Sequence, residues 1–419
     1  MVRHESTTSP PRRNAADPGG EPAWVTLDSR AGPGKIRTHS APLPPFRADH
    51  VGSLLRPPRL KLARERQLGP QTADRHLGPH DDPDLRRVED ECIRAAIAMQ
   101  ERAGLSAVTD GEFRRRSWWL ELIMNWEGLS ADRAGNSDVV WRNQSGVQQA
   151  ASRLWINGPI RWRESPIVRA FAFLKAHTRR TPKVTIPAPM ILHMHAGGDK
   201  GVREGHYKDV ERFWDDVIAA YRREVTALAA AGATYIQFDD TSFAMLCDPL
   251  YRATVQKWDN DPDRLVLEYA ERTNQVIAAL PDGVTVALHQ CRGNREGNWM
   301  AQGGYEPVAD VLFNRIDVDG YFLEYDTPRA GSFAPLRFLP RGKKVVLGLV
   351  SSKDPRLESV EGLKRRIEEA AKAAPLEQLG LSPQCGFASS IKGNPLTEAD
   401  QEAKLARIVE VARAVWGNT

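Results

Sequence analysis

One pattern recurs along the chain from about residue 46: an amphipathic helix, a stop of small residues, a short apolar run and a polar cluster. In residues 84–104 the apolar side chains recur at helical spacing, and the run ends at Gly104 before SAVTDGE. Residues 213–232 likewise end at Gly232 and lead into TYIQFDD. Helical periodicity closed by glycine and followed by a short apolar run predicts alternating helices and buried parallel strands.

Eight short apolar runs are candidate strands, and helical stretches separate most of them. Such a series predicts an α/β fold, a single (β/α)8 barrel. The competing fold, a doubly wound open sheet, gathers its chemistry at one switch point. Here polar residues follow nearly every run, which favours the barrel. The runs are 46–53, 106–110, 183–189, 234–239, 284–289, 320–324, 344–350 and 379–384.

Two segments depart from the repeat. Residues 1–45 are rich in Pro, Gly, Ser and Arg and predict a disordered tail before a barrel over 46–419. Residues 114–182 form a long insertion after the second strand, and RLWINGPIRW within it predicts a hairpin turning at Asn157-Gly158. The insertion is either a subdomain with its own aromatic core or a lid that holds a planar or anionic ligand. Its tryptophans are Trp118, Trp119, Trp126, Trp141, Trp155 and Trp162.

Composition excludes several classes of protein. The formal charge of +4 is mild for 419 residues and its basic residues are interspersed with acidic ones, which gives no support to nucleic-acid binding. No apolar run reaches the roughly 20 residues of a membrane span. Four widely spaced cysteines are not a disulfide framework, which favours a reducing, cytoplasmic location.

Three strand ends carry soft or borderline metal ligands: His289 with Cys291, Glu324, and Cys385. One imidazole, two thiols and one carboxylate are a plausible set for zinc, Zn2+. The alternative is a core histidine with two structural cysteines, the interpretation given to the remaining Cys92 and Cys247. Two thiolates and a carboxylate would make the zinc complex anionic, so activation of a substrate thiol is favoured over hydrolysis.

Carboxylates end two further strands, at Asp110 with Glu112 and at Asp239 with Asp240. They are candidates for binding a substrate ammonium group, although helix capping is the alternative for each. The HVGS end of the first strand offers backbone N–H groups and a hydroxyl for a substrate carboxylate. Thiolate, ammonium and carboxylate sites together describe an amino acid that carries a thiol. The substrate-binding candidates in HVGS are His50, Gly52 and Ser53.

An ordered set of motifs over residues 46–418 resembles the cobalamin-independent methionine synthase family, in particular its catalytic C-terminal barrel and its short single-barrel members. The motifs are HVGS, DGEF, YIQFDD, H-x-C-x-GN, YFLEYD, LGLVSSK and SPQCGFAS. The resemblance implies transfer of a methyl group from a methylated folate to homocysteine. It also implies zinc ligands at His289, Cys291, Glu324 and Cys385. The positions that match those holding the homocysteine backbone are Ser53, Glu112 and Asp239.

Two departures concern the methyl donor. Long members carry an additional N-terminal barrel that helps bind polyglutamyl folate, and they have a proton-donating histidine where this chain has Lys353. We expect Lys353, His193 and the tryptophan-rich insertion on the donor side, with Glu112 and Asp239 as acceptor-side catalytic candidates. Similar enzymes use methylcobalamin, or join an epoxide to the thiol of coenzyme M. A non-catalytic zinc-binding barrel is the alternative from another class.

Overall fold

The computed structural model describes residues 44–69, 80, 82–131 and 137–419. The predicted tail, residues 1–45, therefore lies outside the described residues except for its last two. Six parallel strands form one sheet in the order β12-β11-β10-β9-β8-β7. These strands are β7 (Val184–Pro187), β8 (Tyr235–Asp240), β9 (Thr285–Gln290), β10 (Gly320–Glu324), β11 (Lys344–Val350) and β12 (Leu379–Pro383).

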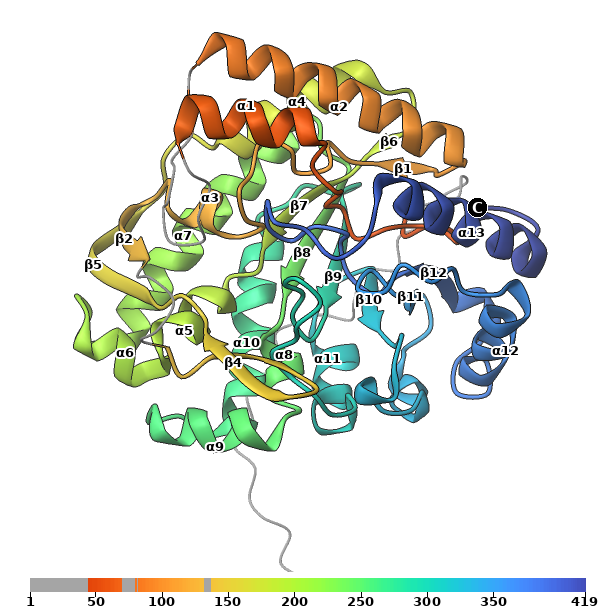
Figure 1. The fold of residues 1–419 in the computed structure, drawn as a ribbon. Coiled ribbons are helices and arrows are strands. Elements are labelled where there is room, and N and C mark those ends of the chain that lie inside the picture. Colours follow the sequence, from red (N-terminus) through yellow and green to blue (C-terminus); the bar gives the residue numbers. More distant parts are fainter. Residues whose placement is uncertain (1–43, 70–79, 81, 132–136) are drawn as a thin grey trace, which may run out of the picture. The chain divides into compact units, whose positions relative to one another are not determined.

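Two further positions close this sheet into a ring. β1 (Ala107–Val108) pairs in parallel with β6 (Thr181–Pro182), which continues directly into β7. At the other edge, Ala48 forms a parallel bridge with Leu381 of β12. The backbone N–H of Leu54 donates to Gly111 O at 3.1 Å, which joins the first strand to the turn after β1. The predicted (β/α)8 barrel is confirmed (Figure 1).

Helices surround the strands, and several begin at a capping side chain. Asp82, Asp209 and Asp261 each accept a hydrogen bond from a backbone N–H in the first turn of the helix that follows. The helices outside the insertion are α1 (Pro58–Leu68), α2 (Pro83–Ala103), α5 (Met190–Ala196), α6 (Gly198–Glu204), α7 (Val210–Ala230), α8 (Ser242–Met245), α9 (Pro249–Lys257), α10 (Pro262–Ile277), α11 (Ala309–Arg315), α12 (Val360–Ala370) and α13 (Glu398–Trp416).

The insertion between β1 and β6 forms two antiparallel pairs. β2 pairs with β5, and β3 pairs with β4. The predicted hairpin at Asn157-Gly158 is wrong, because both residues lie inside β5, where its register against β2 shifts. The tight turn instead joins β3 to β4. The elements are α3 (Leu120–Ile123), β2 (Glu127–Ala131), β3 (Val140–Asn143), β4 (Gly146–Ala150), β5 (Leu154–Arg161) and α4 (Pro166–His177).

The insertion shares the hydrophobic core of the barrel. Trp119, Trp126 and Trp141 are buried in the same cluster as the residues of the surrounding helices. The ring of Trp126 packs edge-on against Tyr221 of α7, with ring centroids 5.0 Å apart. A separate aromatic core, one of the two interpretations of the sequence, is therefore not what the structure shows. The insertion therefore packs directly against the helices of the barrel.

The interior of the barrel beneath the site holds an ion pair. Lys183 Nζ lies 3.2 Å from Asp49 Oδ1, and the Tyr235 hydroxyl donates to Asp49 Oδ2 at 2.9 Å. The Lys183 ammonium also lies 3.9 Å from the centroid of the Phe322 ring. These hydrogen bonds and the aromatic contact offset the free-energy cost of burying the two charges. The pair fills the interior of the barrel below the residues at the carboxyl ends of the strands.

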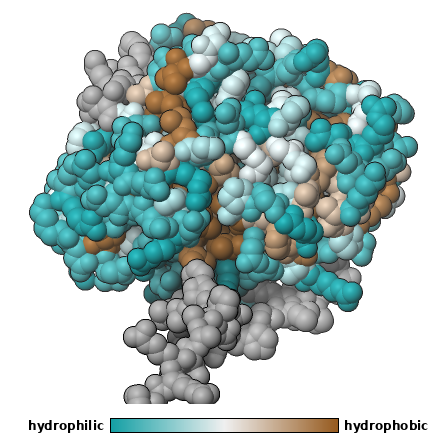
Figure 2. All heavy atoms as spheres, turned by 90° about the horizontal axis from the view of Figure 1, so that it is seen from below, coloured by the Kyte–Doolittle hydropathy of each residue, from teal (hydrophilic) through white to brown (hydrophobic). Residues whose placement is uncertain are grey.

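The surface is predominantly hydrophilic in the face shown in Figure 2, where hydrophobic residues gather in a narrow band. The large exposed hydrophobic side chains are few among the described residues: Leu62, Val147, Leu250, Leu267, Leu357 and Leu376. None of the described helices is long and apolar enough to cross a membrane. All four cysteines are free and buried, as the prediction of no disulfide framework requires.

Candidate active site

A cavity opens at the carboxyl ends of the strands and holds about 1060 Å³ of empty space, counted out to its mouth. Its floor is formed by strand ends, and the insertion and the loops after β9 and β12 form its walls. The carboxyl ends of the strands carry the active sites of (β/α)8 enzymes. Of the residues predicted from the sequence, the cavity is lined by Ser53, Glu112, Asp239, Asp240, His289, Cys291 and Cys385.

Three of the four predicted metal ligands meet on this floor. His289 lies in β9, Cys291 follows that strand directly, and Cys385 follows β12; their ligand atoms all lie within 4.8 Å of one another. The two Sγ atoms are 3.6 Å apart. Two thiolates bound to one zinc at about 2.3 Å in tetrahedral geometry would be about 3.8 Å apart, so the spacing fits this metal.

The imidazole of His289 is oriented for metal binding. Its Nδ1 lies 3.2 Å from the carbonyl oxygen of Phe322, which can only accept, so Nδ1 carries the proton. The other nitrogen, Nε2, is buried and has no hydrogen-bond partner among the described residues. An imidazole whose remote N–H donates to a backbone carbonyl is the usual arrangement of a zinc-ligating histidine. His289, Cys291 and Cys385 therefore fit a bound zinc.

The two thiols, whose sulfurs lie 3.6 Å apart, shift each other's pKa in opposite directions. The hydrogen bond with Cys291 holds the pKa of Cys385 well below its usual range, and His289 lowers it further. The same hydrogen bond, together with burial, raises the pKa of Cys291. One sulfur is thus predisposed to be a thiolate, the form that binds metal.

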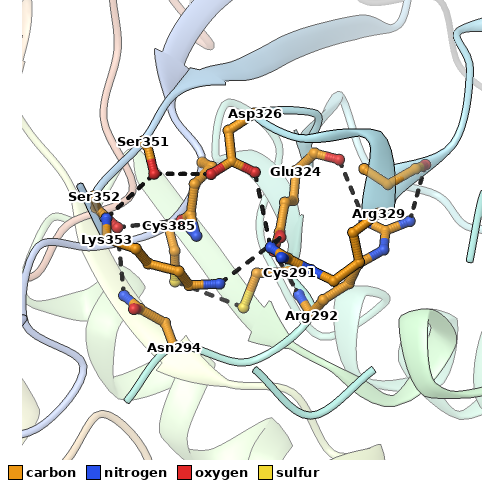
Figure 3. A network of polar contacts seen from close by, with 12 residues as sticks. Cys291, Arg292, Asn294, Glu324, Asp326, Arg329, Ser351, Ser352, Lys353 and Cys385 are labelled. Atoms are coloured by element: carbon orange, nitrogen blue, oxygen red, sulfur yellow. Dashed lines mark hydrogen bonds and ion pairs between the residues drawn. The ribbon is translucent and has the colours of Figure 1, made fainter. Parts of the chain in front are cut away.

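The fourth predicted ligand, Glu324, lies outside the cluster at the end of β10. Its Oε2 accepts from the backbone N–H of Arg292 at 2.7 Å, and its Oε1 accepts from Arg329 Nη2 at 2.8 Å (Figure 3). Lys353 Nζ lies 3.8 Å from the same Oε1. Burial alone would raise the pKa of Glu324, but Lys353, Arg292 and Arg329 hold it at about 2. Glu324 is therefore an ionised carboxylate held by cations.

Lys353 does not line the cavity, and its ammonium faces Glu324 from the loop after β11 (Figure 3). Its positive charge also contributes to the lowered pKa of Cys385. The expectation that Lys353 faces a methyl donor stays a prediction.

Two carboxylates form the acidic wall of the cavity. Glu112 Oε1 accepts from the Thr185 hydroxyl at 2.8 Å, whereas Oε2 has no partner among the described residues. Burial raises the pKa of Glu112, although the nearby Arg115 partly offsets this effect. Burial also raises the pKa of Asp239, to about 7. Buried carboxyl groups with spare acceptor capacity are suited to a cationic ligand.

Glu112 adopts a backbone conformation that is rare for its residue type, with φ of 60°. Such strain persists where the surrounding structure enforces it, and it is frequent at functional sites. Here the backbone N–H of Glu112 donates to Asp110 Oδ1 at 2.9 Å, which fixes the turn. Asp110 does not line the cavity, and its carboxylate supports the turn that carries Glu112. Asp240 does line it, and its Oδ2 accepts from Gln290 Nε2 at 2.5 Å.

The HVGS segment contributes Val51 and Ser53 to the lining of the cavity, whereas His50 and Gly52 do not line it. His50 is buried below the floor, where burial and then Lys183 lower its pKa to about 4. Gly52 has φ of +139°, and a Cβ there would come within 2.7 Å of Thr185 Cγ2, so glycine is required for this close approach.

Aromatic rings form another part of the cavity wall. Trp118, Trp119 and Trp141 of the insertion line the cavity together with His195. The rings of Trp119 and His195 stack with centroids 4.6 Å apart and an interplanar angle of 29°. Burial lowers the pKa of His195 to about 4, so this imidazole is neutral near pH 7. The wall therefore presents flat, uncharged surfaces to a ligand.

His193, the histidine predicted on the donor side, does not line the cavity, whereas His195 of the same H-x-H pair does. The Nδ1 of His193 lies 2.8 Å from the Tyr269 hydroxyl and its Nε2 lies 3.0 Å from Asp199 Oδ1, away from the cavity. The two histidines lie on the short helix α5, where residues two apart face different directions, so sequence spacing alone does not choose between them.

Sequence reasoning missed several other cavity residues. Asn294 was quoted only within a motif, although its position three residues after Cys291 was a usable signal. Its Nδ2 donates to Gly386 O at 2.6 Å and so joins the loop after β9 to the loop after β12. The remaining missed side chains lie in irregular loops that show no periodicity. The missed residues include Asn294, Arg295, Met300, Ser389 and Lys392.

The fold and this cavity define a (β/α)8 barrel enzyme with a buried His-Cys-Cys cluster. A family model for the catalytic domain of cobalamin-independent synthase matches residues 159–414. The chain belongs to the cobalamin-independent methionine synthase family, a family of methyltransferases.

Individual relatives agree with this membership. The chain is 39% identical over 375 residues to the uncharacterized protein YxjH of Bacillus subtilis, covering 89% of this chain and 95% of that protein. It is 26% identical over 317 residues to the methionine synthase of Pyrococcus abyssi, covering 75% and 80%. A Listeria monocytogenes structure assigned to the vitamin-B12 independent methionine synthases has 32% identity and a TM-score of 0.67, covering 89% and 99%. The B12-independent methionine synthase of Shewanella sp. W3-18-1, solved with selenomethionine, has 21% identity, a TM-score of 0.66 and coverage of 88% and 97%, which supports the fold alone.

Proposed function

We propose that this protein is a zinc-dependent methyltransferase that moves a methyl group from a methylated folate to the thiol of homocysteine and so forms methionine. The observation that carries the proposal is the cluster of His289, Cys291 and Cys385 on the floor of a cavity with carboxylates on one wall and aromatic rings on another. Family membership supports methyl transfer to homocysteine. The zinc and the folate are our inference from the residues present.

The proposed metal site, one imidazole and two sulfurs, suits a metal ion of borderline softness. The proposed reaction requires a thiol as the acceptor. His289 Nε2 and the sulfurs of Cys291 and Cys385 would hold the zinc, and the spacing of the sulfurs supports this assignment. When bound there, zinc would stabilise the thiolate form of the acceptor at neutral pH. The protein's own contribution is a buried, fixed geometry, in which the Phe322 carbonyl orients His289 and Asn294 joins the two cysteine loops.

The acceptor's amino-acid end would lie against the acidic wall. Glu112 Oε2 lacks a partner, and Asp239 has a pKa near 7, so each can accept hydrogen bonds from an ammonium group. An ammonium group at this position favours the ionised carboxylates and lowers both pKa values. The Ser53 hydroxyl, across the cavity floor, is available to the substrate carboxylate. Together these groups would orient the acceptor's thiol toward the cysteine cluster.

The donor would occupy the aromatic wall. A flat pteridine-like ring fits against the stacked Trp119 and His195, because offset stacking of planar rings is favourable and both surfaces are uncharged. Arg295 and Lys392 line the same cavity and carry charges opposite to those of a folate's carboxylates. In the transfer, the acceptor sulfur gains the methyl carbon as the carbon–nitrogen bond of the donor breaks, and the leaving nitrogen gains a proton.

The test is a reconstitution with defined donors. Zinc-loaded protein and homocysteine are combined in turn with methyltetrahydrofolate, its polyglutamate and methylcobalamin, and methionine is measured. We expect methionine with a folate donor and none with the Cys385→Ser variant, which removes one cluster sulfur. No methionine with any of the three donors would refute methionine synthesis, and methionine from methylcobalamin alone would refute the folate.

A further inference from the structure

Arg56 follows the first strand of the barrel and is almost fully buried, with 2% of its surface exposed. Among the described residues, its guanidinium forms four hydrogen bonds, all with backbone carbonyl oxygens. Its Nη1 donates to Leu54 O at 3.0 Å and to Ala388 O at 2.5 Å, and its Nη2 donates to Glu112 O at 2.8 Å and to Arg115 O at 3.1 Å. Burial lowers the pKa of Arg56 to about 10, so the group is still a cation at neutral pH. The hydrogen bonds offset the free-energy cost of burying this charge.

The carbonyl groups that Arg56 binds belong to three segments, and each segment carries a side chain that lines the cavity. The first segment ends the first strand and carries Ser53, and the second is the turn after β1, which carries Glu112. The third is the loop after β12, which carries Cys385. The backbone N–H of Phe387 in the third segment also donates to Ser53 O in the first, at 2.9 Å. One buried side chain therefore joins the parts of the cavity to which the carboxylate, the ammonium and the sulfur of the acceptor are assigned.

Glu112 is held both at its backbone and at its carboxylate. Its backbone has φ of 60°, a conformation that is costly for a glutamate, and its carbonyl oxygen accepts from Arg56. Its Oε1 accepts from the Thr185 hydroxyl at 2.8 Å, which leaves Oε2 for a ligand. Burial raises the pKa of Glu112, and the charges of Arg115 and Arg56 partly offset this rise. Arg56 thus fixes the turn that carries Glu112, whereas Thr185 fixes its carboxylate.

We propose that Arg56 is a positioning residue for the acceptor side of the cavity, because it fixes the Glu112 turn against the segments that carry Ser53 and Cys385. Arg56 does not line the cavity itself, so it acts on the acceptor only through these three residues. A guanidinium suits this task because its N–H donors point in fixed, planar directions, whereas a lysine ammonium is a compact charge on a flexible stem. The identity of the acceptor rests on the proposed function, whereas the contact of Arg56 with the three segments does not.

The first test measures how well the cavity recognises an ammonium group. Zinc-loaded wild type and Arg56→Lys are titrated calorimetrically with homocysteine and with 4-mercaptobutyrate, which keeps the thiol and the carboxylate but lacks the ammonium. The lysine keeps the charge but loses the fixed donors to the Glu112 turn, so the preference for homocysteine over 4-mercaptobutyrate should fall about tenfold. A purely structural defect would lower the temperature of thermal unfolding without changing this ratio. An unchanged ratio in the folded variant would overturn the proposal.

The second test separates the turn from the carboxylate. Thr185→Val keeps the shape of threonine but removes the hydroxyl that donates to Glu112 Oε1, so the same preference should fall about tenfold. Zinc affinity, measured by competition with a chelator, should stay at the wild-type value in this variant. In Arg56→Lys zinc affinity should fall about tenfold, the lower end of the effect of outer-shell partners, because Arg56 also binds the loop that carries Cys385. A zinc affinity of Arg56→Lys equal to that of Thr185→Val would contradict the proposal.

The matched control is Lys343→Met. Lys343 is also a cation that donates to backbone carbonyl oxygens, that of Phe313 at 3.1 Å and that of Ile316, but it precedes β11 at the end of the barrel away from the cavity. Its loss should lower the temperature of thermal unfolding and change neither the ligand preference nor the zinc affinity. An equal loss of zinc affinity in Lys343→Met and Arg56→Lys would reveal a general effect of stability and overturn the proposal.

Two further outcomes are decided by the same measurements. If neither thiol binds the wild type, the proposed function fails, whereas the comparison of zinc affinities still decides the role of Arg56. If Arg56→Lys does not fold, Arg56→Gln, which keeps a planar amide donor, is measured in its place against Lys343→Met.

Discussion

Asn294 provides a direct test of how the two cysteine loops are held together. Its Nδ2 donates to Gly386 O at 2.6 Å, and its Oδ1 accepts from Asn394 Nδ2 at 2.8 Å. Asn294→Ala leaves the buried Gly386 carbonyl without this donor, which should cost about 1–3 kcal/mol of unfolding free energy. Because Gly386 follows Cys385, zinc affinity should also fall by 10–100-fold, about 1.4–2.7 kcal/mol.

The matched control for this experiment is Asn274. Its Nδ2 donates to Arg315 O at 2.6 Å and its Oδ1 accepts from the Asp317 N–H at 2.8 Å, so the hydrogen bonds are alike but remote from the cavity. Unfolding of the metal-free variants in urea gives the stability loss, and competition with a chelator gives the zinc affinity. Asn274→Ala should leave zinc affinity unchanged. Equal zinc affinities in the two variants would refute the structural role given to Asn294.

Three other changes test the acidic wall of the cavity, the loop after β12 and a buried carboxylate of α7. Glu112→Gln should weaken homocysteine binding by about 30-fold, since it removes one partner of a buried charge pair, while zinc content stays at the wild-type level; loss of the metal would contradict this role. Gly386→Ala would place a Cβ 1.9 Å from Ser53 Oγ, so homocysteine affinity should drop about tenfold while the zinc stoichiometry measured by metal analysis is retained. Burial raises the pKa of Glu224, which accepts from Trp162 Nε1, from 4.5 to about 6. The folded state therefore binds this proton more tightly, and about 2 kcal/mol of stability present below pH 4.5 is lost as the pH rises through 6. Glu224→Gln should remove that loss in urea titrations at pH 4.5 and 7, and an unchanged pH dependence would count against the buried carboxylate as its source.

The barrel was predictable because its signal is local and repeated. Several helices end at a small residue, as α2 does at Gly104, and most strands are short apolar runs, so the alternation can be recognised without knowledge of any contact. The polar residues that follow the strands then indicated a site at the carboxyl ends of the barrel strands. The hairpin at Asn157-Gly158 failed because a dipeptide that favours a tight turn also suits an irregular position inside a strand, and β5 pairs with the distant β2.

Site residues could be predicted where the side chain lies at the end of a strand. They could not be predicted where the orientation of the side chain depends on a charged partner elsewhere in the chain. His289 and Cys291 lie at a strand end, so the topology alone brings them to the cavity. The sequence suggested separate roles for Lys353 and Glu324. In the structure their opposite charges hold the two side chains 3.8 Å apart. Side chains that pair with buried opposite charges turn toward those charges, and no periodicity in the sequence encodes that choice.

The charges around the cysteine cluster also distinguish between possible acceptors. Arg329 and Lys353 are cations paired with Glu324, whereas the carboxyl groups of Glu112 and Asp239 line the cavity itself. A substrate with a thiol and an ammonium group matches this lining, with its sulfur at the cluster and its ammonium at the carboxylates. A thiol that carries a sulfonate in place of an ammonium would bring an anion against two buried carboxyl groups, a repulsive arrangement that selects against it. The structure therefore favours an amino-acid thiol over a coenzyme M-like thiol through the sign of the charge at its acceptor wall.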